Sequence, residues 1–253
     1  MPLPDPIQKT AAPANVEAKA GMPPASQLGV PVALPEYLEQ TYWWAYLHPR
    51  GVSLFERQWL VNLILWGNYR TLRDAVFSEL RLSGTAQVLQ VACVYGDFTA
   101  TLARRLGPSA RLDVVDVAPV QLENLRRKVG RRANVVLHHQ DSANLVFPDQ
   151  SYDFVVVFFL LHEQPQQARM RTVAEALRVA RRGGKIIFVD YHGPSGLNPL
   201  RYVMRPILGK LEPYALDMWS TDIASWLPAN AKPSRVEKSV YFGGLYQKVV
   251  VTL

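Results

Sequence analysis

Five short apolar runs alternate with helical stretches along the middle of the chain. Continuous Val, Ile and Leu runs of this length are typical of strands buried on both faces of a parallel sheet. The stretches between them end in basic residues followed by Gly, as the C-termini of helices do. The pattern predicts a doubly wound α/β domain. The runs are AQVLQVAC (86–93), RLDVVDV (111–117), NVVLHH (134–139), YDFVVVFFL (152–160) and GKIIFVD (184–190).

The segments before and after this alternation differ from it in composition. After Pro35 the chain is dense in aromatic residues, and a long helix is predicted over about residues 54–80, broken or bent near Gly67. Residues 191–234 follow the fifth run and are rich in Pro and large apolar side chains. This segment is too long for an ordinary connection and predicts a lid. The last two β-type runs, separated by a Gly-Gly pair, predict a hairpin.

These differences in composition divide the chain into three predicted parts. Residues 1–34 alternate Pro with Ala and lack apolar periodicity, which predicts a disordered tail. Residues 35–84 are expected to form helices that cover an active site, and residues 85–253 to form the α/β domain with the lid insertion. The pattern contains neither a secretory signal nor a clear transit peptide, so a bacterial cytoplasmic protein is the expectation.

Composition narrows the function classes. The chain is 49% hydrophobic and 19% charged with a net charge of +7, which is typical of a soluble globular protein with an affinity for acidic partners or surfaces. A single cysteine excludes an intramolecular disulfide and a multi-cysteine metal site. The longest apolar run, Phe154 to Leu161, is far shorter than the ~20 residues of a spanning helix, so membrane contact is expected to be peripheral. Basic stripes without interleaved aromatic residues argue against nucleic acid as a partner.

In an open parallel sheet, ligands bind beyond the carboxyl ends of the strands, so the residues after each run carry the chemistry. Asp116 ends the second run, where a carboxylate can accept both hydroxyls of a ribose; an Asp that opens the next turn is the alternative. Asp141 and Ser142 follow the third run, placed to meet an adenine edge, although an ordinary polar loop is equally common. His162 and Glu163 follow the fourth run and could shuttle protons, bind a divalent metal or form a mere loop pair.

These strand ends resemble those of the class I methyltransferases that use S-adenosylmethionine, over about residues 85–253. DVAPVQL, with Asp116 and Val117, resembles the ribose loop of that family; QDSANLVFPDQSYDFVV resembles its adenine loop and fourth strand; and ALRVARRGGKIIFVDY resembles its later helix and fifth strand. The resemblance implies a seven-stranded, mostly parallel, Rossmann-like sheet with a C-terminal β-hairpin, and S-adenosylmethionine as the cofactor. Within the family, enzymes acting on ubiquinone and menaquinone precursors are the nearest in pattern.

The first loop departs from the family pattern. The family has an acidic residue and then Gly-x-Gly-x-Gly, whereas this chain has Gln90, Ala92, Val94 and Gly96. A Cβ at two of the glycine positions removes space beside the cofactor, so the methionine half must shift or the loop must take another path. A decayed loop in a protein that lost its cofactor is the alternative. We expect the loop residues Ala92, Val94, Tyr95, Gly96 and Asp97 to contact the cofactor.

The segment VACVYGDFT, the aromatic N-terminal helices and the apolar lid together resemble the rhodoquinone biosynthesis enzymes, a branch of the methyltransferase relatives. That resemblance implies conversion of ubiquinone to rhodoquinone, in which an amino group from S-adenosylmethionine replaces a ring methoxy group with manganese assisting. Asp97, Tyr95, His162 and Glu163 are then the candidate catalytic residues. The best available manganese ligands are Glu163, Asp190 and His192.

Two other functions stay open from the sequence. The chain could be an ordinary methyltransferase acting on a quinone or another small apolar substrate, or a binding protein without activity. A ubiquinone substrate dissolves in the bilayer, which predicts an enzyme bound peripherally to the inner membrane. The predicted contact is the lid segment with Leu200, Val203 and Ile207; a lid packed on its own domain is the alternative. The oligomeric state does not follow from the sequence.

Overall fold

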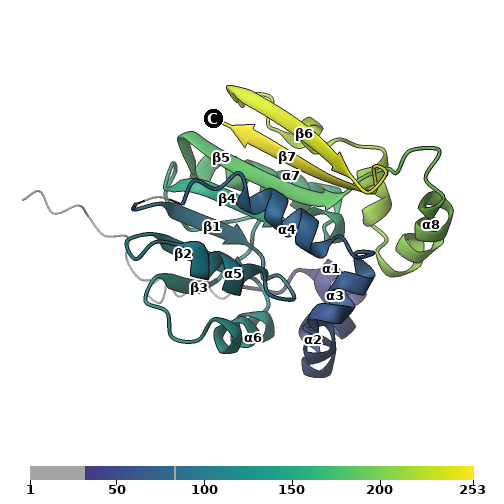
Figure 1. Ribbon diagram of the computed structural model, residues 1–253, viewed down its shortest axis with the longest axis horizontal. Helices are drawn as coiled ribbons and strands as arrows, with labels where there is room; N and C mark the ends of the chain where they lie inside the picture. The colour runs from purple at the N-terminus through teal and green to yellow at the C-terminus, as the bar shows by residue number, and fades with distance from the viewer. Residues whose placement is uncertain (1–31, 83) are drawn as a thin grey trace, which may run out of the picture. The chain divides into compact units, whose positions relative to one another are not determined.

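The computed structural model describes residues 32–82 and 84–253, and seven strands form one sheet in the order β3-β2-β1-β4-β5-β7-β6 (Figure 1). The first five strands run parallel, and β7 and β6 continue the sheet in antiparallel register. The predicted tail, residues 1–34, lies outside the described residues except for its last three. The strands are β1 (Gln87–Val91), β2 (Arg111–Asp116), β3 (Val135–His139), β4 (Tyr152–Phe158), β5 (Ala180–Tyr191), β6 (Arg235–Tyr241) and β7 (Tyr246–Thr252).

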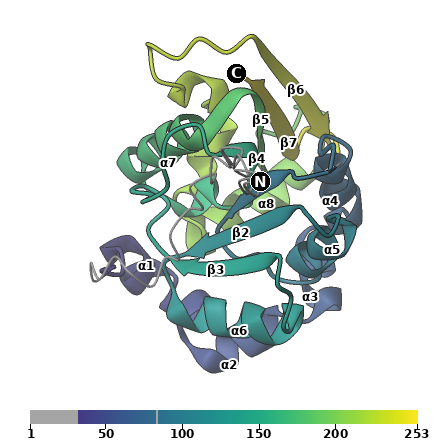
Figure 2. The ribbon, with the colours of Figure 1, turned by 90° about the vertical axis from the view of Figure 1, so that its left-hand side faces the viewer.

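This architecture is the class I methyltransferase fold that the sequence predicts. The middle strands are buried along almost their whole length because helices cover both faces of the sheet. Figure 2 shows α4 and α5 on one side of the sheet and α7 on the opposite side. The strand order reverses between β1 and β4, and the crevice of a doubly wound sheet opens at that reversal. The covering helices are α4 (Tyr69–Phe77), α5 (Phe98–Arg105), α6 (Pro119–Val129) and α7 (Gln166–Val179).

Four short helical segments precede α4 and lie near the carboxyl ends of the parallel strands (Figure 1). The helix predicted over residues 54–80 is interrupted near Gly67, as expected, but it is also broken at Arg57, which the sequence did not predict. Arg57 has extended backbone between two of these segments, and Trp66 and Gly67 adopt φ values of 51° and 78° just before α4. Left-handed backbone ends a right-handed helix. The segments are α1 (Glu36–Thr41), the π-helical turn η2 (Trp43–Leu47), α2 (Pro49–Phe55) and α3 (Gln58–Ile64).

The segment predicted as a lid contains α8 (Leu200–Leu211) and two 3₁₀ turns, η4 (Ala215–Trp219) and η5 (Ile223–Trp226). Helix α8 buries Met204 and Leu208 and leaves most of its other side chains exposed. The predicted hairpin is confirmed as β6 and β7. None of the helices in the described residues is long and apolar enough to cross a membrane.

Candidate active site

A cavity of about 600 Å³, which includes some open solvent, lies beyond the carboxyl ends of β1, β2 and β3. Its floor is the end of β2 and the loop that follows β1, and its roof is the N-terminal segment with Tyr37 and Tyr46. Five of the predicted cofactor-binding residues line it. They are Ala92, Asp116, Val117, Asp141 and Ser142.

Asp116 is held in a fixed orientation by two backbone amides. Its Oδ2 accepts a hydrogen bond from the Cys93 amide at 2.7 Å, and its Oδ1 accepts one from the Ala118 amide at 2.8 Å. Burial raises the pKa of Asp116, and the two amides oppose that shift by stabilising the charged form. Because each carboxylate oxygen has a second lone pair, Asp116 can still accept the two hydroxyls of a ribose.

The loop after β3 supplies polar groups of the kind that an adenine ring needs. Gln140 lines the cavity, and its Nε2 is buried and has no hydrogen-bond partner among the described residues. Ser142 shares hydrogen bonds of 3.0 Å with Thr172 and Gln164, which fix the loop against α7. An orphaned donor beside a ribose acceptor fits the adenosine half of S-adenosylmethionine.

The first loop keeps a glycine-like turn although two glycines of the family pattern are replaced. Ala92 adopts a φ of 73°, a conformation that L-residues rarely enter, and in this way keeps the turn that a glycine would make. Val94 lines a second cavity and not the first. Gly96 lines neither cavity; a Cβ there would lie 2.8 Å from Oε1 of Gln58. The amide of Gly96 donates to Glu56 at 3.2 Å, so the N-terminal helices approach this part of the loop closely.

Asp97 lies away from both cavities, contrary to the sequence expectation. Both of its oxygens accept hydrogen bonds of 2.9 Å from Nη1 of Arg73, and Oδ2 also accepts from Thr101 at 3.2 Å. Partial burial raises the pKa of Asp97, but the Arg73 guanidinium outweighs it and holds the pKa below its usual range. The predicted role at the transferred amine does not fit this placement. Asp97 instead joins α4 to α5.

Tyr95 connects the loop to its cover. Its hydroxyl donates to the carbonyl of Ala45 at 2.6 Å and accepts from Nε2 of Gln121 at 2.7 Å. Its ring stacks on Tyr46 with 5.7 Å between centroids. Although Tyr95 lines the second cavity, its hydroxyl is already satisfied, so the contacts give it a positioning role.

The second cavity has about 780 Å³ of space, again with some open solvent, and is lined mainly by apolar and aromatic side chains. Four residues line both cavities and mark where they meet: Tyr46, Cys93, Phe159 and Glu163. A flat aromatic molecule in the second cavity would therefore face a cofactor in the first across this junction.

A buried acid–imidazole cluster lies at the same junction. Nδ1 of His162 donates to Oδ1 of Asp190 at 2.9 Å, and Nε2 of His162 lies 3.8 Å from Oε1 of Glu163. Burial lowers the pKa of His162, but the Asp190 charge outweighs it and raises that pKa to about 9. Burial raises the pKa of Glu163 to about 8. At neutral pH the imidazole is therefore cationic and much of Glu163 carries its proton.

Tyr46 and Glu212 are among the cavity residues that the sequence did not predict. Tyr46 comes from η2, and Glu212 lies at the end of α8 with its Oε2 buried and without a hydrogen-bond partner among the described residues. Burial raises the pKa of Glu212. Its only sequence signal is that it is the single acidic residue between Asp190 and Asp217. Nothing in the sequence distinguishes Tyr46 from the other aromatic residues around it.

The predicted manganese ligands are not brought together. Asp190 is occupied by His162 and by the amides of Leu161 and Tyr191, and Nδ1 of His192 bonds to the Gly244 carbonyl at 2.7 Å. No group of three His, Cys, Asp or Glu side chains suited to a metal occurs in residues 32–82 and 84–253. The predicted set of Glu163, Asp190 and His192 is therefore wrong, because Asp190 orients the histidine.

Comparison with known proteins identifies the family. Residues 88–184 match the family model "Methyltransferase domain". A demethylmenaquinone methyltransferase of Staphylococcus saprophyticus is 30% identical over 161 residues, covering 60% of this chain and 67% of that protein. One from Geobacillus is 29% identical over 191 residues, covering 72% and 79%.

Solved structures agree on the fold. A SAM-dependent methyltransferase from Aquifex aeolicus has a TM-score of 0.50 at 17% identity, over 81% of this chain and 98% of that chain. The N-methyltransferase NodS from Bradyrhizobium japonicum, solved with S-adenosyl-l-homocysteine, has a TM-score of 0.52 at 14% identity, over 72% and 85%. The chain belongs to the family of S-adenosylmethionine-dependent methyltransferases.

Proposed function

We propose that this enzyme converts ubiquinone to rhodoquinone by replacing a ring methoxy group with an amino group from S-adenosylmethionine. The observation that carries the proposal is the meeting of two cavities at Glu163 and Tyr46. The first cavity has groups suited to adenosine, and the second has the aromatic lining suited to a quinone ring. The relatives named as demethylmenaquinone methyltransferases support a substrate of the quinone class.

Amino transfer sets requirements that the junction can meet. An ammonium group has no free lone pair, so a proton must leave the donor nitrogen before the nitrogen attacks the ring carbon. The bond from that carbon to the methoxy oxygen then breaks, and methoxide leaves with a proton as methanol. To free the amino group, the donor Cα must lose its proton and pass two electrons to the quinone, and water must hydrolyse the C=N bond that results, so the products are an aminohydroquinone and a 2-oxo acid. A carboxyl group with a pKa near neutrality can accept the proton from nitrogen and return one to methoxide. Glu163 lines both cavities and has its pKa raised to about 8, while the His162 cation beside it can polarise a ring oxygen.

The cofactor supplies the group that is transferred, and the chain binds and orients it. Asp116 would hold the ribose, and Gln140 with the loop of Asp141 would hold the adenine. Val94, whose side chain stands where the family loop has a glycine, lines the second cavity and supports an unusual placement of the methionine half. No step is assigned to manganese, because the described residues do not assemble its predicted ligands.

The second candidate is methyl transfer to a quinone, which the family favours. Mass spectrometry of the quinone product separates the two. Purified protein is given S-adenosylmethionine and a short-tailed ubiquinone, with and without added Mn²⁺. Exchange of methoxy for amino makes the quinone lighter, and this is the expected result. Methylation makes it heavier and would replace the proposal with the second candidate.

A further inference from the structure

Large apolar side chains are exposed on the N-terminal helices beside the second cavity. Trp43, Trp59 and Leu63 are 51%, 59% and 63% exposed. Trp59 and Leu63 are four residues apart on α3 and therefore lie on one face of that helix. Exposed apolar patches of this kind mark contact surfaces in soluble proteins. The other exposed members from these segments are Trp44, Leu54, Ile64 and Trp66.

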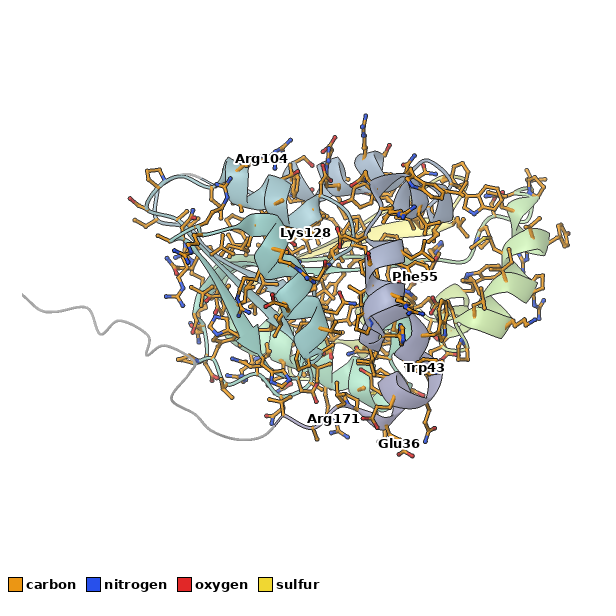
Figure 3. The ribbon with its side chains drawn as sticks, turned by 90° about the horizontal axis from the view of Figure 1, so that it is seen from below. Glu36, Trp43, Phe55, Arg104, Lys128 and Arg171 are labelled. Carbon is orange, nitrogen blue, oxygen red and sulfur yellow. The ribbon has the colours of Figure 1, made fainter. Side chains whose placement is uncertain are left out.

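Helix α8 extends this surface. Nε1 of Trp66 lies 3.2 Å from Sδ of Met204, which brings the end of α3 against α8. Figures 1 and 3 both show α8 beside the N-terminal helices. We use the name docking face for the exposed apolar side chains of the N-terminal helices given above together with those of α8. The members from α8 are Tyr202, Val203, Ile207 and Leu211.

Cations accompany the docking face, and acids are almost absent from it. The only acidic residue within residues 43–70 and 200–211 is Glu56, which is paired with Lys128 at 2.7 Å. Six exposed cations come from the same segments, and none of them forms an ion pair within the described residues. Surfaces that bind anionic bilayers combine Trp, Leu and Ile side chains, which enter the interface, with Arg and Lys side chains, which are attracted to the headgroups. The cations are Arg50, Arg57, Arg70, Arg201, Arg205 and Lys210.

The docking face is continuous with the second cavity. Trp44 and Ile64 are 37% and 40% exposed and also line that cavity. We propose that the docking face binds the surface of an anionic bilayer, so that an apolar substrate passes from the lipid into the second cavity. A second copy of the chain is a poorer occupant, because a two-fold contact would place like cations against each other. The passage of substrate rests on the proposed function, whereas the lipid contact does not.

Flotation with vesicles tests the lipid contact directly. The full-length protein is mixed with phosphatidylcholine vesicles that contain or lack phosphatidylglycerol, without cofactor or quinone. We expect binding that is stronger on the anionic vesicles, and a loss on the order of tenfold or more in W59S/L63S. V203S/I207S should also bind more weakly. The matched control is V236S/V240S on β6, which removes two valines that are 41% and 53% exposed and should bind like the parent.

Three results would overturn the proposal. The first is that W59S/L63S binds vesicles as strongly as the parent. The second is that the β6 control loses as much vesicle binding as W59S/L63S does. The third is that the parent is a dimer in sedimentation equilibrium and that W59S/L63S is a monomer. Circular dichroism of each variant checks that the fold is retained. If vesicles are bound but no aminoquinone forms, the proposed function fails and the docking face stands; the opposite pair of results rejects the docking face alone.

Discussion

Substitution of Glu163 by Gln tests the chemistry at the junction of the two cavities. The amide keeps the size of the side chain and removes its ability to exchange a proton. Glu163 is 8% exposed, so water cannot readily replace it as a proton acceptor. General acid–base help is typically worth about 10² to 10⁴ in rate. We therefore expect aminoquinone formation to fall by about 10²-fold or more, with affinity for S-adenosylmethionine nearly unchanged because Asp116 still holds the ribose.

The pH profile gives a second readout of the same variant. If the unprotonated carboxylate is the base, the parental rate should rise with pH up to the raised Glu163 pKa of about 8 and then fall as the His162 cation is lost near pH 9. The Gln variant should lose this rise. Single-turnover rates from pH 6 to 9, with product measured by mass spectrometry, provide the assay. A Gln variant that works within tenfold of the parent and keeps the parental profile would refute the role of Glu163.

Three further predictions concern the cofactor cavity, the α4–α5 junction and stability. Asp116→Ala should weaken S-adenosylmethionine binding at least tenfold in isothermal titration, because charge-assisted hydrogen bonds worth about 1.5 to 3 kcal/mol each are lost; unchanged affinity would move the cofactor elsewhere. Asp97→Asn should lower the free energy of unfolding in urea by about 0.5 to 1 kcal/mol, because it weakens the half-exposed ion pair with Arg73, and should leave turnover within tenfold of the parent. A variant of normal stability that is a hundredfold slower would show that Asp97 takes part in the reaction. The pKa of His162 is raised from 6.5 to about 9, so the protonated imidazole stabilises the fold fully below pH 6.5, and this contribution is lost as the pH rises through 9. We expect the melting temperature of the parent to fall over that range and His162→Gln to remove part of the fall. An unaltered pH dependence in the variant would contradict this.

The fold could be predicted because its signal is carried by long, uniform patterns. Buried runs such as the one in β4 read as strands wherever they occur, and the Gly-Gly pair marks the hairpin. The helix predicted across residues 54–80 failed at Arg57, where extended backbone separates α2 from α3, whereas the break near Gly67 was predicted from the glycine itself. A periodic pattern of side chains does not show that the backbone becomes extended at a residue such as Arg57.

The candidate site was predictable only where chemistry follows a strand directly. Asp116 is the last residue of β2 and Glu163 follows β4, and the parallel sheet places both at the cavities. Asp97 was placed at the cofactor from its position in the loop, but the partner that decides its role is Arg73, from a helix distant in sequence. Glu212 was missed for the same reason, since its approach to the cavity depends on how α8 packs.

Isotope tracing with a doubly labelled donor tests the central claim most directly. S-adenosylmethionine carrying ¹⁵N in its amino group and ¹³C in its sulfonium methyl group is incubated with the enzyme and a short-tailed ubiquinone, and the quinone is analysed by mass spectrometry. Amino transfer predicts a product that contains ¹⁵N, lacks one methoxy group and contains no ¹³C-methyl. A product that carries the ¹³C-methyl group without ¹⁵N would contradict the account and show methyl transfer.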